Sequence, residues 1–287
     1  MQSPHLLQGL ATIHTIIAKA KKSFPVLTHV LLGLFLAACA SFPSESLREH
    51  GFETRIIPEN DFLLYTLVRE KEKGAPWLVY IEGDGHAWTS RTQPSQDPTP
   101  RNPVALYLAL HDTAPNRLYL ARPCQYVTNA TCEQKYWTTH RFAPVIIDTL
   151  NTAIDRITGD APKQLIGYSG GGAVAALLAV RRQDVSKLTT YAGNMDIDAF
   201  TTIHHVTPLS GSLNPMNIAP HLKEIPQIHY VGSEDSVIPV SLVKGFIKAQ
   251  GENNCAQLVV VNGASHSDLV SLVQSGKNTS IEATPCK

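Results

Sequence analysis

The sequence predicts an α/β protein with a mostly parallel central sheet and helices on both of its faces. Short runs of apolar and β-branched residues alternate with longer segments whose apolar residues recur at helical spacing. Strands joined through helices run parallel, and a parallel sheet needs a helical layer on each face. The chain has 287 residues, of which 43% are hydrophobic and 17% charged, which is enough for one large core.

Turn residues separate the elements expected in the first half of the domain. The expected strands are residues 62–70, 76–83 and 116–123, and the expected helices are residues 102–112 and 144–159. Pro103 stands early in the first helix, where its missing N–H is harmless. Gly159 provides a stop signal for the second helix.

The second half continues the same alternation. The expected strands are residues 163–169, 187–193, 226–232 and 256–263, and the expected helices are residues 170–182, 241–249 and 267–276. Residues 194–224 show no clear period and are long enough to cover a cleft. No linker divides the chain, so we expect one domain.

One serine stands where the strand at 163–169 must become a helix. Residues 167–171 read Gly-Tyr-Ser-Gly-Gly, a complete G-x-S-x-G. A serine in this place also suits an ordinary helix cap. The strand before it and the helix after it favour a nucleophile elbow, in which a strained turn aims the Ser169 oxygen at a substrate. Small neighbours are needed because strand and helix approach closely there.

An acid and a histidine follow at later strand ends. Residues 230–239 leave a strand and carry Asp235 in the turn, and residues 260–268 place His266 before the last helix. The order Ser, Asp, His is that of an α/β-hydrolase triad. All three candidates lie at the carboxyl ends of expected parallel strands, where active sites gather.

The three side chains would then have distinct roles. Ser169 is a weak nucleophile until His266 takes its proton, and Asp235 holds the imidazole in the right tautomer. Asp196, which follows the preceding strand, is the second candidate for the acid.

From about Gly51 onward the chain resembles the α/β-hydrolases, in particular the small secreted or lipid-anchored bacterial members. In that family the acid follows a glycine and two further residues and precedes an apolar residue and a proline. The resemblance therefore implies Asp235 rather than the adjacent Glu234 as the acid. The fold implied is the α/β-hydrolase fold.

The resemblance also implies an oxyanion hole. One donor is the backbone N–H of Gly170, and the other is the backbone N–H of Asp84 or Gly85. Residues 80–88 resemble the H-G-x-G turn of the family, with Glu82 where a histidine is usual. This departure leaves the backbone donor in place.

Two features near this turn have more than one interpretation. Glu82 and Asp84 bring two acids close to the site, and we expect Glu82 to bond loop backbone; a contact with substrate is the alternative. Residues 121–126, Ala-Arg-Pro-Cys-Gln-Tyr, look like a family feature, and we expect a disulfide-stapled loop that lines the cleft.

These features predict a serine hydrolase that cleaves an ester or related acyl bond through an acyl-enzyme, with a small-molecule or lipid-like acyl substrate. A carboxylesterase-like activity leads, and the sequence does not separate it from a thioesterase or a peptidase. The alternative is an envelope lipoprotein that uses the fold for binding without catalysis. No cofactor or metal is expected, because no phosphate-binding glycine motif or metal-ligand spacing occurs. The net charge of zero gives no footprint for nucleic acid.

The amino terminus has the plan of an export signal. Three lysines at 19, 21 and 22 precede an apolar segment, and Leu36-Ala37-Ala38-Cys39 resembles the lipobox of bacterial lipoproteins. We expect residues 1–38 to be a signal peptide, lipid on Cys39, a tether at 39–50 and the hydrolase domain at 51–287. The resemblance implies an outer-membrane lipoprotein, because no Asp follows Cys39. A periplasmic or secreted protein with an ordinary signal, or a retained anchor, are the alternatives.

Four further cysteines fit an exported protein. Cys124 and Cys132 lie in one short polar loop and are expected to pair, which leaves Cys255 and Cys286 to tie the carboxyl-terminal tail to the domain. Four free thiols are the alternative.

Overall fold

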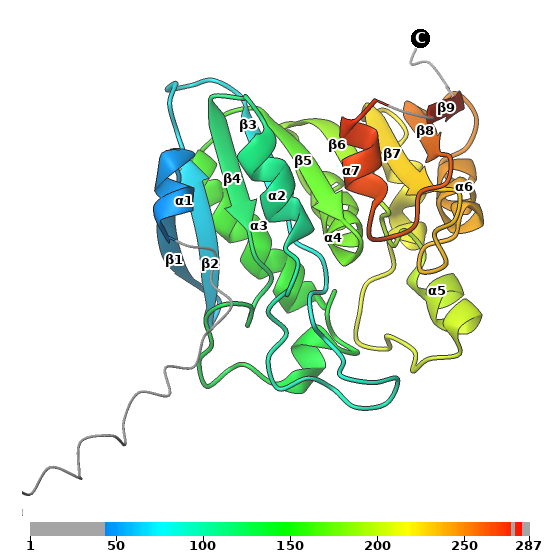
Figure 1. Cartoon of the computed structure of the whole chain (residues 1–287), viewed down its shortest axis with the longest axis horizontal. Helices are drawn as coiled ribbons and strands as arrows, with labels where there is room; N and C mark the ends of the chain where they lie inside the picture. Colours follow the sequence, from blue (N-terminus) through cyan, green and yellow to red (C-terminus); the bar gives the residue numbers. More distant parts are fainter. Residues whose placement is uncertain (1–43, 277–278, 283–287) are drawn as a thin grey trace, which may run out of the picture. The chain divides into compact units, whose positions relative to one another are not determined.

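One mixed sheet organises the part of the chain that the structure describes. The computed structural model describes residues 44–276 and 279–282 (Figure 1). Within them, nine strands form a sheet in the order β1-β2-β4-β3-β5-β6-β7-β8-β9. The strands are β1 (Glu53–Glu59), β2 (Phe62–Arg69), β3 (Trp77–Ile81), β4 (Asn116–Leu120), β5 (Lys163–Tyr168), β6 (Val185–Tyr191), β7 (Gln227–Gly232), β8 (Ala256–Val261) and β9 (Thr279–Glu282).

The strands from β4 to β8 are all parallel, so the predicted fold class is confirmed. β2 pairs antiparallel with both β1 and β4, and β9 pairs antiparallel with β8. Ile81 of β3 lies between Leu120 of β4 and Gly167 of β5. The loops that follow these three strands therefore leave the sheet side by side.

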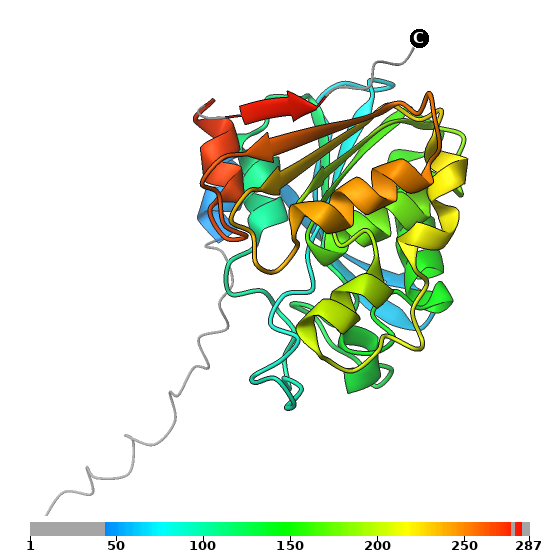
Figure 2. The ribbon, with the colours of Figure 1, turned by 90° about the vertical axis from the view of Figure 1, so that its right-hand side faces the viewer.

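Helices cover both faces of the sheet, as Figure 2 shows in a view along its edge. One face carries α1 (Ser44–Glu49), α2 (Val104–His111) and α7 (Leu269–Gln274), which contribute to one buried apolar cluster. The other face carries α3 (Pro144–Thr158), α4 (Gly170–Ala179) and α6 (Val240–Ala249), which contribute to the larger cluster. α5 (Ile197–His204) and the 3₁₀ helix η2 (Pro215–Leu222) add buried residues to the larger cluster.

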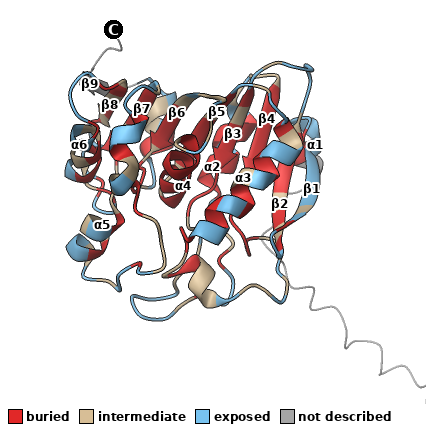
Figure 3. Cartoon of the chain, turned by 180° about the vertical axis from the view of Figure 1, so that it is seen from behind, coloured by how far each residue is buried: buried red, intermediate tan, exposed pale blue. Residues whose placement is uncertain are grey.

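α3 and α4 differ in how they are buried, and the sequence explains why. α3 has an apolar stripe and a charged face, and Figure 3 shows that face exposed. α4 reads Gly-Gly-Gly-Ala-Val-Ala-Ala-Leu-Leu-Ala, and every residue of it is buried. A helix with no polar face is stable only inside the protein, so α4 is enclosed by the rest of the fold.

The structure differs from the sequence prediction at the margins. β1 and α5 were not predicted: β1 is an edge strand with mostly exposed residues, so it lacks the apolar alternation of a covered strand. α1 lies within the expected tether 39–50, and its Leu47 is buried against the α2 side of the core. The fold therefore starts before residue 51.

The predicted signal peptide and Cys39 lie outside the described residues. None of the helices in the described part combines the length and the apolar character needed to cross a bilayer.

Candidate active site

Ser169 occupies a strained turn between β5 and α4. Its backbone has φ 52° and ψ −119°, a region that residues with a side chain rarely adopt. A Cβ on Gly167 would overlap the carbonyl oxygen of Gly171, and a Cβ on Gly171 would overlap that of Ile81. Only glycine fits these positions, so the turn is shaped by close packing of α4 against β5 and β3.

Ser169, His266 and Asp235 lie in hydrogen-bonding contact, although they come from three different loops. The Nε2 atom of His266 is 3.2 Å from the Ser169 Oγ atom, and Nδ1 is 2.8 Å from the Asp235 Oδ2 atom. When the imidazole carries its proton on Nδ1, it donates a hydrogen bond to Asp235. The unprotonated Nε2 atom can then accept the proton of Ser169. The three residues predicted from the sequence are thus joined by a continuous chain of hydrogen bonds.

Asp235 is held by its own turn after β7. Its side chain is completely buried, and its Oδ1 atom accepts the backbone N–H groups of Val237 and Ile238 at 2.8 and 2.7 Å. Because these donors occupy one oxygen, the other is directed at His266. The imidazole also packs beside the ring of Tyr168, whose hydroxyl donates to the His266 carbonyl at 3.2 Å.

The two other acid candidates have other surroundings. Glu234 is exposed. Asp196 is the N-cap of α5, where it accepts the backbone N–H groups of Asp198 and Ala199 and the side-chain amide of Asn214. Its carboxylate therefore stabilises a helix end, which accounts for the residue without catalysis.

A pocket of about 300 Å³ opens beside the serine. Its lining includes Ser169 and His266 together with Asp84 and Gly85 from the loop after β3. Gly170 is buried, and a Cβ on it would overlap the carboxylate of Asp84. The structure therefore brings the residues predicted for the oxyanion hole to one side of the nucleophile.

Glu82 is buried at the start of this loop and bonds backbone, as expected. It accepts the Gly83 N–H at 2.9 Å, the Tyr119 hydroxyl at 3.1 Å and, at 3.4 Å, two backbone N–H groups from the first turn of α2. Burial raises the pKa of Glu82 to about 7, although these hydrogen bonds act in the opposite direction. The carboxyl therefore ties the loop at residues 82–86, called the oxyanion loop because the sequence predicts an oxyanion hole there, to α2.

The pKa of Glu82 predicts a pH-dependent stability difference. The folded protein holds this proton up to about pH 7 and the unfolded chain only to about 4.5, so this group makes the protein less stable as pH rises between those values. His229 acts in the opposite sense, because burial lowers its pKa from 6.5 to about 4. We therefore expect the unfolding free energy of Glu82→Gln, measured relative to that of wild type, to rise by about 3 kcal/mol between pH 4 and pH 7.5.

Urea unfolding at a series of pH values measures this difference, and the contribution of His229 cancels because both proteins carry it. A difference between the two proteins that stays constant with pH would contradict the assignment.

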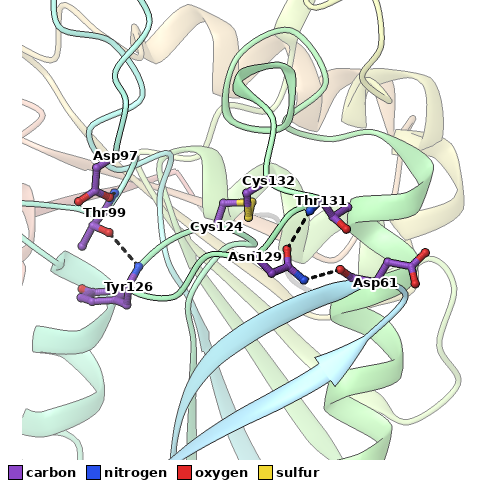
Figure 4. Close-up of a disulfide and its surroundings, with 8 residues drawn as sticks. All are labelled: Asp61, Asp97, Thr99, Cys124, Tyr126, Asn129, Thr131 and Cys132. Atoms are coloured by element: carbon purple, nitrogen blue, oxygen red, sulfur yellow. Dashed lines mark hydrogen bonds between the residues drawn. A yellow bond between two sulfur atoms is a disulfide. The ribbon is translucent and has the colours of Figure 1, made fainter.

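The loop after β4 is closed by the predicted disulfide between Cys124 and Cys132, shown in Figure 4. Within this loop, the Asn129 side chain donates to the Asp61 carbonyl at 2.7 Å, beside the β1–β2 turn. The Tyr126 N–H donates to the Thr99 hydroxyl at 2.8 Å. The disulfide loop is thereby fixed to two other segments. Cys286 lies outside the described residues, so its pairing with Cys255 stays a prediction.

Removing this disulfide should weaken the fold. A loop of this length contributes about 2–3 kcal/mol by restricting the unfolded chain. We expect the Cys124→Ala/Cys132→Ala double variant to lose about that much unfolding free energy in urea. An identical midpoint for variant and wild type would contradict the estimate.

Three residues that the sequence did not assign lie next to the oxyanion loop. Arg122 and Arg141 form ion pairs with Asp84, and Gln125 donates to the Gly83 carbonyl. Two of them belong to the segment 121–126, for which the sequence predicted only a lining loop.

No group of three metal-binding side chains occurs among the residues that the structure describes.

Comparison with solved structures identifies the fold. An esterase from Pyrococcus furiosus aligns with a TM-score of 0.59 at 14% identity, over 82% of this chain and 91% of the esterase. A serine hydrolase homologue from Coxiella burnetii aligns with a TM-score of 0.51 at 16% identity, over 78% of this chain and 93% of the homologue. A membrane phospholipase A aligns with a TM-score of 0.52 at 13% identity, over 81% of this chain and 87% of the phospholipase.

This protein has the α/β-hydrolase fold, as its sequence resemblance implies. Its sequence matches no protein-family model and no curated protein.

Proposed function

We propose that this protein is a serine hydrolase that cleaves an ester or related acyl bond through an acyl-enzyme. The observation that carries the proposal is the path of hydrogen bonds from Asp235 through His266 to Ser169, at the wall of an open pocket. Hydrogen bonding alone is common in proteins. Its combination with a strained nucleophile and a buried acid is the arrangement that acyl transfer requires.

The steps follow from the geometry. His266 takes the Ser169 proton as the oxygen attacks the acyl carbon, and Asp235 stabilises the imidazolium that forms. The same imidazolium then protonates the leaving group, which departs and leaves the acyl group on Ser169. A water molecule, deprotonated by His266, next attacks this acyl-enzyme, and the acid and the free serine are released. The negative oxygen of the tetrahedral intermediate would be bound by backbone N–H groups of Gly170 and of the loop at Asp84 and Gly85.

Esters are the substrates that we favour. The fold neighbours include an esterase and a phospholipase A, and both act on acyl–oxygen bonds. The same machinery serves thioesters and amides, so the leaving group is a question for experiment.

A fluorophosphonate probe followed by a panel of p-nitrophenyl esters of increasing chain length tests the proposal. We expect covalent labelling at Ser169 and turnover that depends on chain length. A folded protein that neither labels nor hydrolyses any ester would favour the alternative, a lipoprotein that binds without catalysis.

We also propose that the protein is a lipoprotein of the cell envelope, lipidated at Cys39. This rests on the amino-terminal sequence, with its lysines, apolar segment and lipobox-like ending. The Cys124–Cys132 disulfide supports export, because such bonds form in oxidising compartments.

Cys39→Ala should prevent lipid attachment and move the protein out of the detergent phase, because each buried CH₂ adds roughly 0.8 kcal/mol of membrane affinity. Incorporation of labelled palmitate and phase partitioning measure this, with ester hydrolysis retained by the variant. A wild-type protein that takes up no palmitate would leave an ordinary secreted hydrolase.

A further inference from the structure

The segment 121–126 after β4 is built against the oxyanion loop. Gln125 is 1% exposed, and its Nε2 atom donates to the Gly83 carbonyl at 3.1 Å and lies 3.5 Å from the Pro98 carbonyl. Its Oε1 atom accepts the backbone N–H of Arg122 at 2.9 Å. One amide therefore connects the oxyanion loop, the segment at Pro98 and the end of β4.

The carboxylate of Asp84 makes a second connection. Arg122 approaches it at 3.3 Å and Arg141 at 2.8 Å, and both guanidinium side chains are more than nine-tenths buried. Arg122 also donates to the Arg141 carbonyl. Buried cations need a paired anion, so Asp84 cannot turn away without leaving them uncompensated. The same carboxylate lies directly on Gly170.

The oxyanion loop has little stiffness of its own. Gly83 and Gly85 flank Asp84, and Gly85 adopts a φ of 64°. Glycine has the greatest conformational freedom of any residue, so neighbouring side chains must hold the loop. A Cβ on Gly85 would lie 2.7 Å from the Gln125 Nε2 atom, which shows how closely that amide approaches.

Gln125 is itself presented by a strained turn. Cys124 and Tyr126, its two neighbours, have φ values of 70° and 63°, which are costly for residues other than glycine. The disulfide to Cys132 and the bond from Tyr126 to Thr99 hold this turn in place. The chain thus sustains backbone strain where the Gln125 amide meets the oxyanion loop.

We propose that Gln125 is a positioning residue for the oxyanion hole, an inference that rests on the proposed serine hydrolase. It does not touch the reacting atoms. It holds the Gly83 carbonyl and so fixes the orientation of the peptides that follow, which offer an N–H to the tetrahedral intermediate. Donors of this kind act at 2.7–3.1 Å, so a small displacement of the loop reduces the rate strongly.

The test replaces Gln125 with methionine, which keeps the volume and removes all three side-chain hydrogen bonds. We expect kcat, expressed per active site titrated with a fluorophosphonate, to fall about ten- to a hundredfold with KM unchanged. The inhibition constant of a trifluoromethyl ketone, whose tetrahedral adduct uses the oxyanion hole, should rise by the same factor.

Gln250→Met is the matched control. Gln250 is 2% exposed and bonds the amide of Gln227 at 2.8 and 3.0 Å, at the opposite end of β7 from Asp235. Both variants should lose stability, but only Gln125→Met should lose turnover per titrated site. Where Gln125→Met does not fold, Gln125→Glu retains the Oε1 acceptor and the shape while its ionised form lacks the donor to Gly83.

A Gln125 variant with wild-type turnover per titrated site and a wild-type inhibition constant would overturn the proposal and leave the residue a purely structural one. That outcome is distinct from failure of the proposed function. If the proposed function is wrong, the wild-type protein itself is not labelled by the fluorophosphonate and does not hydrolyse esters, and both inferences fall.

Discussion

Ser169→Ala should remove hydrolysis almost entirely, by on the order of a million-fold in rate, because a nucleophile and its base act as a unit. The fold should be unaffected. Alanine at a φ of 52° is no more strained than serine, and the glycines that shape the turn remain. Hydrolysis of a p-nitrophenyl ester and thermal unfolding by circular dichroism measure the two effects.

Ser186→Ala provides a control for this change. Ser186 lies on β6 and donates to the Lys163 carbonyl, at the end of the sheet opposite the site. It should hydrolyse esters at the wild-type rate. Near-wild-type activity in Ser169→Ala, by contrast, would refute the assignment of the nucleophile.

Asp235→Asn should lower the rate by about ten-thousand-fold, as the loss of the acid does in another triad. Two backbone N–H groups donate to the Asp235 Oδ1 atom. The amide oxygen of asparagine would take that place, which directs the NH₂ group at the Nδ1 atom of His266. The histidine would then have to carry its proton on Nε2 and could not accept one from Ser169.

Glu234→Gln and Asp196→Asn are the comparisons, measured as kcat/KM. Glu234 is exposed, so Glu234→Gln should change kcat/KM little. Asp196→Asn alters a helix cap and should change stability by about 1 kcal/mol or less with turnover retained. A severe loss of rate in either of these two variants, with Asp235→Asn mild, would move the acid to that residue.

The strand ends explain why the sequence could predict that the three residues of the candidate triad lie together. Ser169, Asp235 and His266 each follow an apolar run with a clear strand pattern, and parallel strands bring such ends to one edge. The central elements were predictable for the same reason, because buried strands and helices have strong apolar periodicity. Edge elements such as β1 are partly exposed and carry no such pattern.

The support of the oxyanion loop could not be predicted in this way. Asp84, Arg122 and Arg141 come from three segments, and no spacing within any one segment indicates that they meet. The polarity of Gln125 likewise gave no sign that it would be buried, because a glutamine in a polar loop is usually exposed. Such contacts depend on the register of β3 against β4, which only the folded sheet provides.

The packing around the elbow has a consequence for how this protein can diversify. Gly167 and Gly171 leave no room for even one methyl group, so substitutions there abolish the turn and cannot tune it. The residues between β3 and α2 that line the pocket, such as His86, Arg101 and Asn102, carry side chains and stand outside that close packing. For the proposed hydrolase, evolution and laboratory selection can therefore change substrate preference through this loop, while the turn at Ser169 is inherited unaltered.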